Sequence, residues 1–107
     1  MIYEERFTDA ELELIVEAGL IYMCACPGQV ADATRKLREL HRYQLNCLTD
    51  PENDSRVHQA IADSTVLAHA QLQDCLDVVL ELEGWDRQTL QMPEGLRCRQ
   101  KKAMLED

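Results

Sequence analysis

The chain has 107 residues, enough for one domain with a single core and too few for two. Its formal net charge of −9 at pH 7 repels phosphate groups, so we expect no general binding to nucleic acid or to an anionic membrane. Aromatic residues make up 5% of the chain whereas leucine and alanine are abundant, which favours helix packing over a sheet.

The first predicted helix covers about residues 8–24. Thr8 and Glu11 have the spacing of a capping box, in which each side chain bonds the backbone N–H of the other residue. Two apolar stripes then follow on opposite sides of the helix. One stripe contains Phe7, Ala10, Leu14, Ala18, Ile21 and Ala25. The other contains Leu12, Val16, Leu20 and Met23. A second apolar face on so small a domain needs a cover, so we expect these last four residues to form a homodimer interface.

A second helix is predicted from about residue 27 to residue 48. Pro27 ends the first helix because it lacks an N–H group and restricts Cys26 to extended geometry, yet proline suits the first turn of a new helix. Arg35, Arg38 and Arg42 follow along one flank. We interpret this flank as a solvated edge that pairs with acidic residues of the neighbouring helices, and the alternative is a contact for an anion or an acidic partner.

The third helix is the longest and is predicted from about residue 53 to residue 83. Aspartate and serine near its start can accept from the N–H groups of the first turn, and Gly84 can adopt the left-handed conformation that ends a helix. At 100° per residue, one arc of this helix holds a continuous stripe that we predict to face the core. The stripe contains Val57, Ile61, Ser64, Ala68, Leu72, Cys75, Val79 and Leu82.

Short turns make consecutive helices antiparallel neighbours, so the three helices predict an all-α, up-down-up three-helix bundle. After Gly84 the periodic pattern weakens. We expect Trp85, Leu90 and Met92 to dock on the bundle, and the end of the 84–107 extension to be loose. The chain is then a single helical domain, residues 1–107, and its second apolar face predicts a larger bundle formed as a homodimer.

Three cysteines are candidates for a redox or metal site at one end of this bundle. If the second and third helices fold about a turn near Pro51, Cys24 and Cys26 lie close to Cys75. The dipole at a helix N-terminus favours a thiolate, and thiolates bind soft metals. A zinc site usually has a second ligand pair, which is missing here, and buried cysteine packs as a small apolar residue. Packing is therefore the favoured interpretation, with no cofactor expected and a metal at these three cysteines as the alternative.

A group of polar residues falls within or beside the apolar faces of the second and third helices. The group contains His41, Gln44, His58, Ser64 and Thr65. Buried polar groups must be hydrogen-bonded, because an unbonded one costs ~1–3 kcal/mol. We interpret the group as a bonded layer that fixes the register of the helices, and the alternative is a pocket for a small ligand.

The sequence contains no glycine-rich phosphate loop, nucleophile elbow or metalloprotease motif, so an enzyme is not the favoured class. The first residues are charged, and no apolar run approaches the ~20 residues that span a bilayer. The odd number of cysteines favours reduced thiols and a cytoplasmic location. We therefore expect a small cytoplasmic interaction or assembly module that forms a homodimer and binds an unidentified protein partner. The alternative is a thiol-based redox or metal-responsive protein that uses Cys24 and Cys26.

Overall fold

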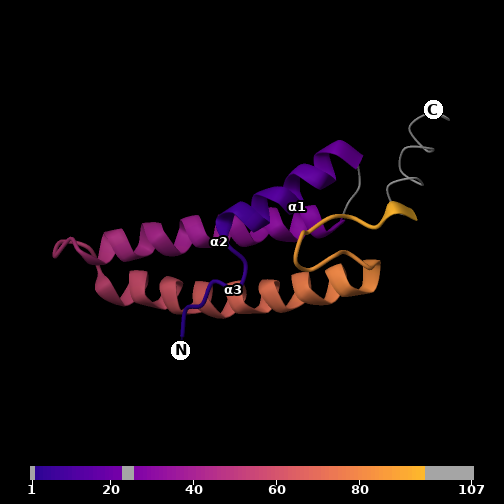
Figure 1. The fold of residues 1–107 in the computed structure, drawn as a ribbon. Helices are drawn as coiled ribbons and strands as arrows, with labels where there is room; N and C mark the ends of the chain where they lie inside the picture. The colour runs from indigo at the N-terminus through magenta and orange to yellow at the C-terminus, as the bar shows by residue number, and fades with distance from the viewer. Residues whose placement is uncertain (1, 23–25, 96–107) are drawn as a thin grey trace.

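The computed structural model describes residues 2–22 and 26–95. Over these residues the fold is all-helical, with three helices and no strand (Figure 1). The helices are α1 (Asp9–Tyr22), α2 (Cys26–Leu48) and α3 (Ser55–Glu83). The helical class expected from the composition is therefore confirmed.

α1 begins at a capping box and buries one side against the rest of the chain. The Thr8 N–H donates to Glu11 Oε1 at 2.9 Å, and the Glu11 N–H donates to Thr8 Oγ1 at 3.0 Å. Leu12 and Ile15 on the following turns are fully buried, as is Phe7 just before the helix. The sequence predicts Leu12 at a dimer interface, and the structure corrects this: the side of α1 that carries Leu12 and Ile15 packs into the core.

α3 has a defined start and a defined end. Asp54 lies just before the helix and its side chain accepts from the Arg56 N–H at 3.0 Å. Gly84 follows the helix with φ 80°, in the left-handed region that favours glycine. The Trp85 N–H then donates to Leu80 O at 2.9 Å, which directs the chain back toward the other helices.

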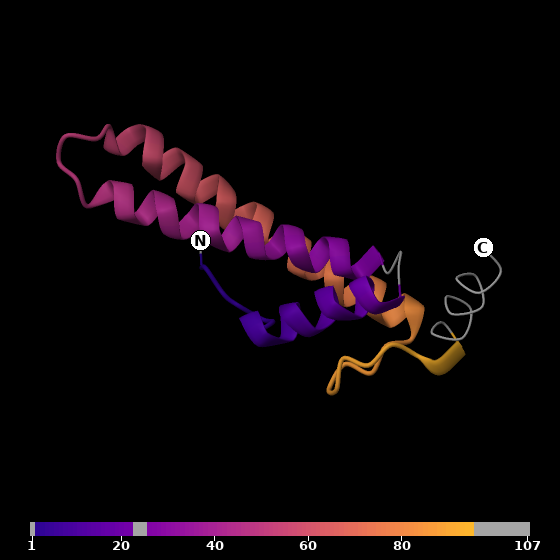
Figure 2. The ribbon, with the colours of Figure 1, turned by 90° about the horizontal axis from the view of Figure 1, so that it is seen from above.

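α2 and α3 form a long hairpin. They are joined by residues 49–54 and lie side by side, so that α3 runs back along α2 (Figure 1). Figure 2 shows that α1, the N-terminal segment 2–8 and the segment 84–95 all lie on one side of this hairpin. The half of the hairpin next to the 49–54 turn has no third helix beside it in the described structure. The molecule is accordingly elongated, with extents of 57 × 26 × 18 Å.

The core lies where α1 and the segment 84–95 meet the hairpin. Burying a leucine- or phenylalanine-sized side chain contributes roughly 1.5–3 kcal/mol, so this cluster supplies most of the hydrophobic stabilisation. Trp85, Leu90 and Met92 belong to it, as the sequence predicts for the extension. The full set of buried apolar side chains in the cluster is Phe7, Leu12, Ile15, Ala31, Leu76, Leu80, Trp85, Leu90 and Met92.

The buried face of α3 is a different face from the one that the sequence predicts. The buried residues of α3 are Ala62, Thr65, His69, Gln73, Leu76 and Leu80. Within the predicted stripe, Val57, Ser64, Ala68 and Leu82 are exposed, and the remaining members are half-buried. The helix is rotated by about a quarter turn relative to the prediction, because polar side chains of α3 bind the N-terminal segment and so face inward.

Candidate functional site

Arg38 of α2 is buried between α3 and the N-terminal segment, with 2% of its side chain exposed. Its guanidinium donates to Phe7 O and Asp9 Oδ1, both at 2.6 Å, and to His69 Nε2 at 2.9 Å. A further bond reaches Gln73 Oε1 at 3.2 Å. The predicted edge is therefore not solvated at this position, whereas its predicted pairing with an acidic residue of a neighbouring helix is found, at Asp9 of α1. A buried guanidinium is tolerated when its donors are bonded and its charge is matched, and Asp9 supplies the matching charge.

The other two arginines of the flank lie nearer the surface. Arg35 is half-buried and pairs with Asp32 of the same helix at 3.0 Å. Arg42 is exposed. Only the middle arginine of the flank thus faces inward, one turn from each of the other two.

Gln73 of α3 binds the backbone of the N-terminal segment with both ends of its side-chain amide. Its Oε1 accepts from the Arg6 N–H at 2.7 Å and from the Phe7 N–H at 3.3 Å. Its Nε2 donates to Glu4 O at 2.8 Å. Because the segment is extended and forms no helix of its own, these bonds satisfy backbone groups that would otherwise need water. We call Arg38, His69 and Gln73 together the Arg38 cluster.

His69 is neutral in this arrangement. The Arg38 Nε–H can only donate a hydrogen bond. His69 Nε2 must therefore accept it, so the proton of the neutral ring lies on Nδ1. Burial, and next the charge of Arg38, hold the pKa of His69 below its usual 6.5. The Tyr3 ring stacks on His69 with centroids 4.9 Å apart and on His41 at 4.3 Å. Burial, followed by a hydrogen bond to Glu5, raises the pKa of Tyr3 to about 12.

The predicted polar layer does not form one layer. Gln44 and His58 do meet across the hairpin, with Gln44 Oε1 2.6 Å from His58 Nδ1. His41 stacks on Tyr3 instead. The Thr65 hydroxyl donates to Ile61 O of its own helix at 2.6 Å, and Ser64 is exposed.

The three candidate cysteines are not shown to meet. Cys26 is exposed at the start of α2, and Cys75 is half-buried in α3. Cys24 lies outside the described residues. Within residues 2–22 and 26–95, no group of three or more histidine, cysteine, aspartate or glutamate side chains is arranged to hold a metal ion.

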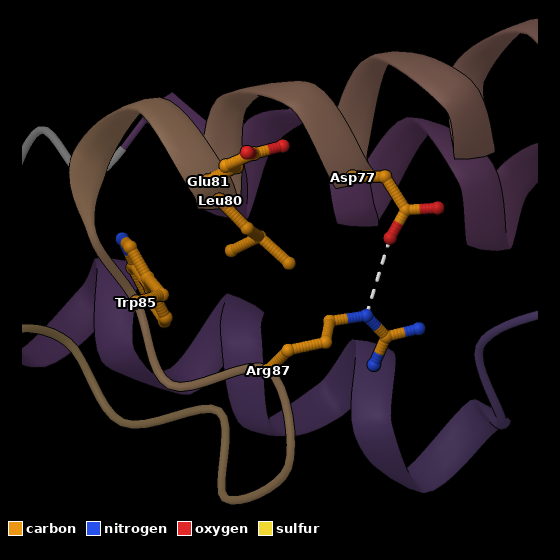
Figure 3. Close-up of a pocket in the computed structure, with 5 residues that line it drawn as sticks. All are labelled: Asp77, Leu80, Glu81, Trp85 and Arg87. Atoms are coloured by element: carbon orange, nitrogen blue, oxygen red, sulfur yellow. Dashed lines mark hydrogen bonds and ion pairs between the residues drawn. The ribbon is translucent and has the colours of Figure 1, made fainter.

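A pocket of about 320 Å³ lies where the segment 84–95 crosses the end of α3. Figure 3 shows its lining, with Asp77, Leu80 and Glu81 on α3 and with Trp85 and Arg87 on the segment. Arg87 is committed to contacts within the chain: its Nε donates to Asp77 Oδ1 at 3.1 Å, and its guanidinium lies 3.9 Å from the centroid of the Phe7 ring. We therefore assign Arg87 to fastening the extension.

An open groove lies on the hairpin, between α2 and α3. It has a volume of about 430 Å³ and is lined by Leu37, Leu40, Ala60, Ile61, Ser64, Thr65 and Ala68. We call these seven residues the hairpin face. Ala60, Ser64 and Ala68 occupy successive turns of α3 and are all exposed. Such a groove, with small side chains along its floor, has the shape that accepts another helix.

The residues of α1 that the sequence predicts at a dimer interface are a weaker candidate contact surface than the hairpin face. Val16 packs against the core and Leu12 is buried in it. Leu20 is 77% exposed and Met23 lies outside the described residues. On α1, the described part of the predicted interface thus reduces to a single leucine, and the hairpin face takes its place as the candidate contact surface.

No protein-family model, curated protein or solved structure matches this chain. In the described part of the chain, no helix combines the length and the apolar character needed to cross a membrane. Inference about function therefore depends on the geometry above.

Proposed function

We propose that this chain is a helical interaction or assembly module, without catalytic activity of its own, and that it works as a homodimer in the cytoplasm. The observation that carries the proposal is the hairpin face. α1, the N-terminal segment and the segment 84–95 lie on one side of the hairpin (Figure 2), and the groove along Leu37, Ala60 and Ala68 is open to solvent. An exposed apolar groove on a small protein marks a contact surface.

A second copy is the occupant that fits this surface best. Each chain then contributes an up-down-up arrangement of its three helices, and the two hairpins complete a larger bundle. The molecule is only 18 Å across in its thinnest direction, which is a little less than two packed helices. Pairing two such molecules face to face covers the groove of each hairpin, which its own chain leaves open.

The polar groups of the molecule support a role without catalysis. Arg38 and Gln73 form hydrogen bonds with the chain's own backbone. Arg38 donates to Phe7 O, and Gln73 donates to Glu4 O and accepts from the Arg6 N–H. These bonds give Arg38 and Gln73 a structural role in holding the N-terminal segment in place. Free thiols at Cys47 and Cys75 agree with a reducing compartment.

Sedimentation equilibrium at micromolar concentration tests the proposal, with twice the chain mass of 12.3 kDa as the expected result. Ala68→Glu places a charge in the groove and is expected to yield monomer, since burying that charge disfavours pairing. Ala70→Glu is the matched control, because Ala70 is an exposed alanine of the same helix outside the groove, and it should leave the mass unchanged. Leu20→Glu should also leave a dimer if the hairpin face is the interface.

Three results would count against the proposal. Monomeric native protein would remove the homodimer, and a dimer that Leu20→Glu dissociates but Ala68→Glu does not would return the interface to α1. A metal ion found in stoichiometric amount in freshly purified protein would favour the thiol-based alternative at Cys24 and Cys26.

A further inference from the structure

We propose that residues 2–6, which we call the strap, detach from α3 when His69 takes up a proton, while the three helices stay folded. The strap and the buried histidine then form a switch that acidification opens. The release does not depend on whether two copies of the chain pair. It follows from the donors that surround the His69 ring and from the way in which the strap is held.

Each ring nitrogen of His69 faces a hydrogen-bond donor of the same chain. Nε2 accepts from the Arg38 Nε–H at 2.9 Å, and Nδ1 lies 3.5 Å from Gln73 Nε2. The Gln73 amide has a fixed orientation, because its Oε1 accepts from the N–H groups of Arg6 and Phe7. A neutral ring satisfies the bond from Arg38, but a protonated ring carries an N–H on both nitrogens and can accept from neither. Protonation therefore breaks the bond to Arg38 and places two positive charges side by side.

The surroundings of His69 oppose a positive charge on the ring. Burial first, and the charge of Arg38 second, lower the pKa of His69, whereas Glu5 acts in the opposite direction. Arg38 cannot move away from the ring without losing its bonds to Phe7 O and Asp9. The titratable and charged groups around the ring and its arginine partner are Tyr3, Glu4, Glu5 and Arg6 of the strap, Asp9 of α1, Arg38 and His41 of α2, and Asp74 of α3.

The strap buries little apolar surface, so it can detach without unfolding the helices. Within residues 2–6, Tyr3 is half-buried and the other side chains are exposed. A hollow of about 250 Å³ is lined by residues of both the strap and α3, so their contact is incompletely filled. The attachment is mainly polar: Gln73 bonds the backbone, and Arg6 Nη2 lies 2.6 Å from Asp74 Oδ1. Segments with few buried apolar contacts open at far lower free energy than the whole fold.

Tyr3 couples the strap to the histidine. Its ring stacks on His69 with the centroids 4.9 Å apart, and on His41 at 4.3 Å. When the strap leaves, water reaches the His69 ring and the pKa of His69 moves back toward its usual 6.5. The attached form has the lower pKa, so proton uptake favours the released form. The attachment is therefore strongest above pH 6.5 and weakens as the pH falls below that value.

Backbone ¹⁵N relaxation of the native chain at pH 7.5 and pH 5.5 tests the release, because it reports order residue by residue. We expect the order parameters of residues 3–6 to fall from about 0.85, typical of rigid backbone, to below about 0.6 at the lower pH. The amides of α1, α2 and α3 should keep their order at both pH values.

Two variants identify the group that takes up the proton. His69→Gln keeps an acceptor for Arg38 and cannot be protonated, so its strap should stay ordered at pH 5.5. His58→Gln is the matched control, because His58 bonds Gln44 near the 49–54 turn and does not contact the strap. Its strap should lose order as in the native chain.

A strap that stays ordered in the native chain at pH 5.5 would overturn the proposal. An equal loss of order in His69→Gln would do the same, as would a strap that stays ordered in His58→Gln. Loss of order in α3 over the same pH range would show unfolding of the helices in place of local release, and would also contradict it.

A titration of the native chain gives a second test that holds even for a His69→Gln chain that fails to fold. The ring resonances of His69 and the order of residues 3–6 are followed over the same pH series. The proposal requires one common midpoint for the two changes. Two separate midpoints would show that His69 does not control the strap.

Discussion

At the scale of single residues, Arg38 of α2 joins three other parts of the molecule. One guanidinium joins α2 to α3 through His69 and to the N-terminal segment through Phe7 O. Asp9 at the start of α1 balances its charge at 2.6 Å. A buried ion pair is weak evidence of net stability, but removing one member leaves the others without partners, and that loss is large.

Arg38→Met is expected to lower the free energy of unfolding by about 2–4 kcal/mol, because Phe7 O and His69 Nε2 lose their donor while the volume is roughly kept. The decrease in the free energy of unfolding should be smaller than for a fully buried ion pair, since Asp9 is exposed and water can solvate its carboxylate once Arg38 is lost. Urea denaturation at fixed protein concentration measures the change. Arg42→Met is the control: Arg42 is exposed one turn away, and its loss should change stability by less than about 0.5 kcal/mol.

His69 makes stability depend on pH in a defined direction. Its pKa is lowered in the folded protein, so the unfolded chain takes up a proton first as the pH falls below 6.5. The stability present above pH 6.5 is then lost progressively until the pH reaches the pKa of the folded state. Arg38 and Arg6 face the ring as positive charges, Glu5 opposes them, and His41 lies nearby.

Unfolding free energies at pH 7.5 and pH 5.5 check this prediction. We expect a decrease for the native chain and a smaller one for His69→Gln, which keeps an acceptor for Arg38 but cannot take up a proton. An equal decrease in both proteins would show that other groups control stability in this range.

The sequence did not reveal the Arg38 cluster, and the reason is physical. A helical wheel ranks faces by apolar content, and by that measure the face with Thr65, His69 and Gln73 is the poorer one. Gln73 faces inward because it bonds the backbone of the extended segment at residues 4–7, and His69 faces inward because it bonds Arg38. The sequence held one sign of this buried polar face. His69 lies on the same flank of the third helix as Thr65 and Leu76, so a polar side chain is aligned with the apolar side chain of Leu76.

At the scale of elements, the local features were the predictable ones. The capping box of Thr8 and Glu11 and the terminal Gly84 depend on neighbours within a few residues, and both are found as expected. The side that a helix buries depends on its partners instead. The sequence shows two apolar faces on α1 and one apolar stripe on α3, and in both helices the arrangement of the other segments decides which face is buried.

Gly84→Ala is expected to destabilise the protein by about 1 kcal/mol, because alanine is strained at φ 80°. A Cβ at Gly84 would meet no atom within 4 Å, so the cost is conformational rather than steric crowding. Gly95→Ala is a matched control: that site is equally open and its φ lies outside the left-handed region. Thermal unfolding of both variants under identical conditions measures the difference, and equal midpoints would contradict the role assigned to Gly84.

At the scale of the whole molecule, the hairpin has a covered side and an open hairpin face. One side of the hairpin is closed by α1, the N-terminal segment and the segment 84–95 (Figure 2). The hairpin face is open to solvent, and we propose that it pairs with a second copy of the chain. Self-association was expected from the sequence, but on α1, because the stripe on α3 was assigned to the core.

Small-angle X-ray scattering tests the central claim most directly, because it reports mass and shape in one experiment. Two hairpins stacked face to face should give twice the chain mass of 12.3 kDa, with a length that stays close to the 57 Å of one chain. The added copy thickens the particle instead of lengthening it. A mass of one chain, or a dimer much longer than a single chain, would contradict pairing through the hairpin.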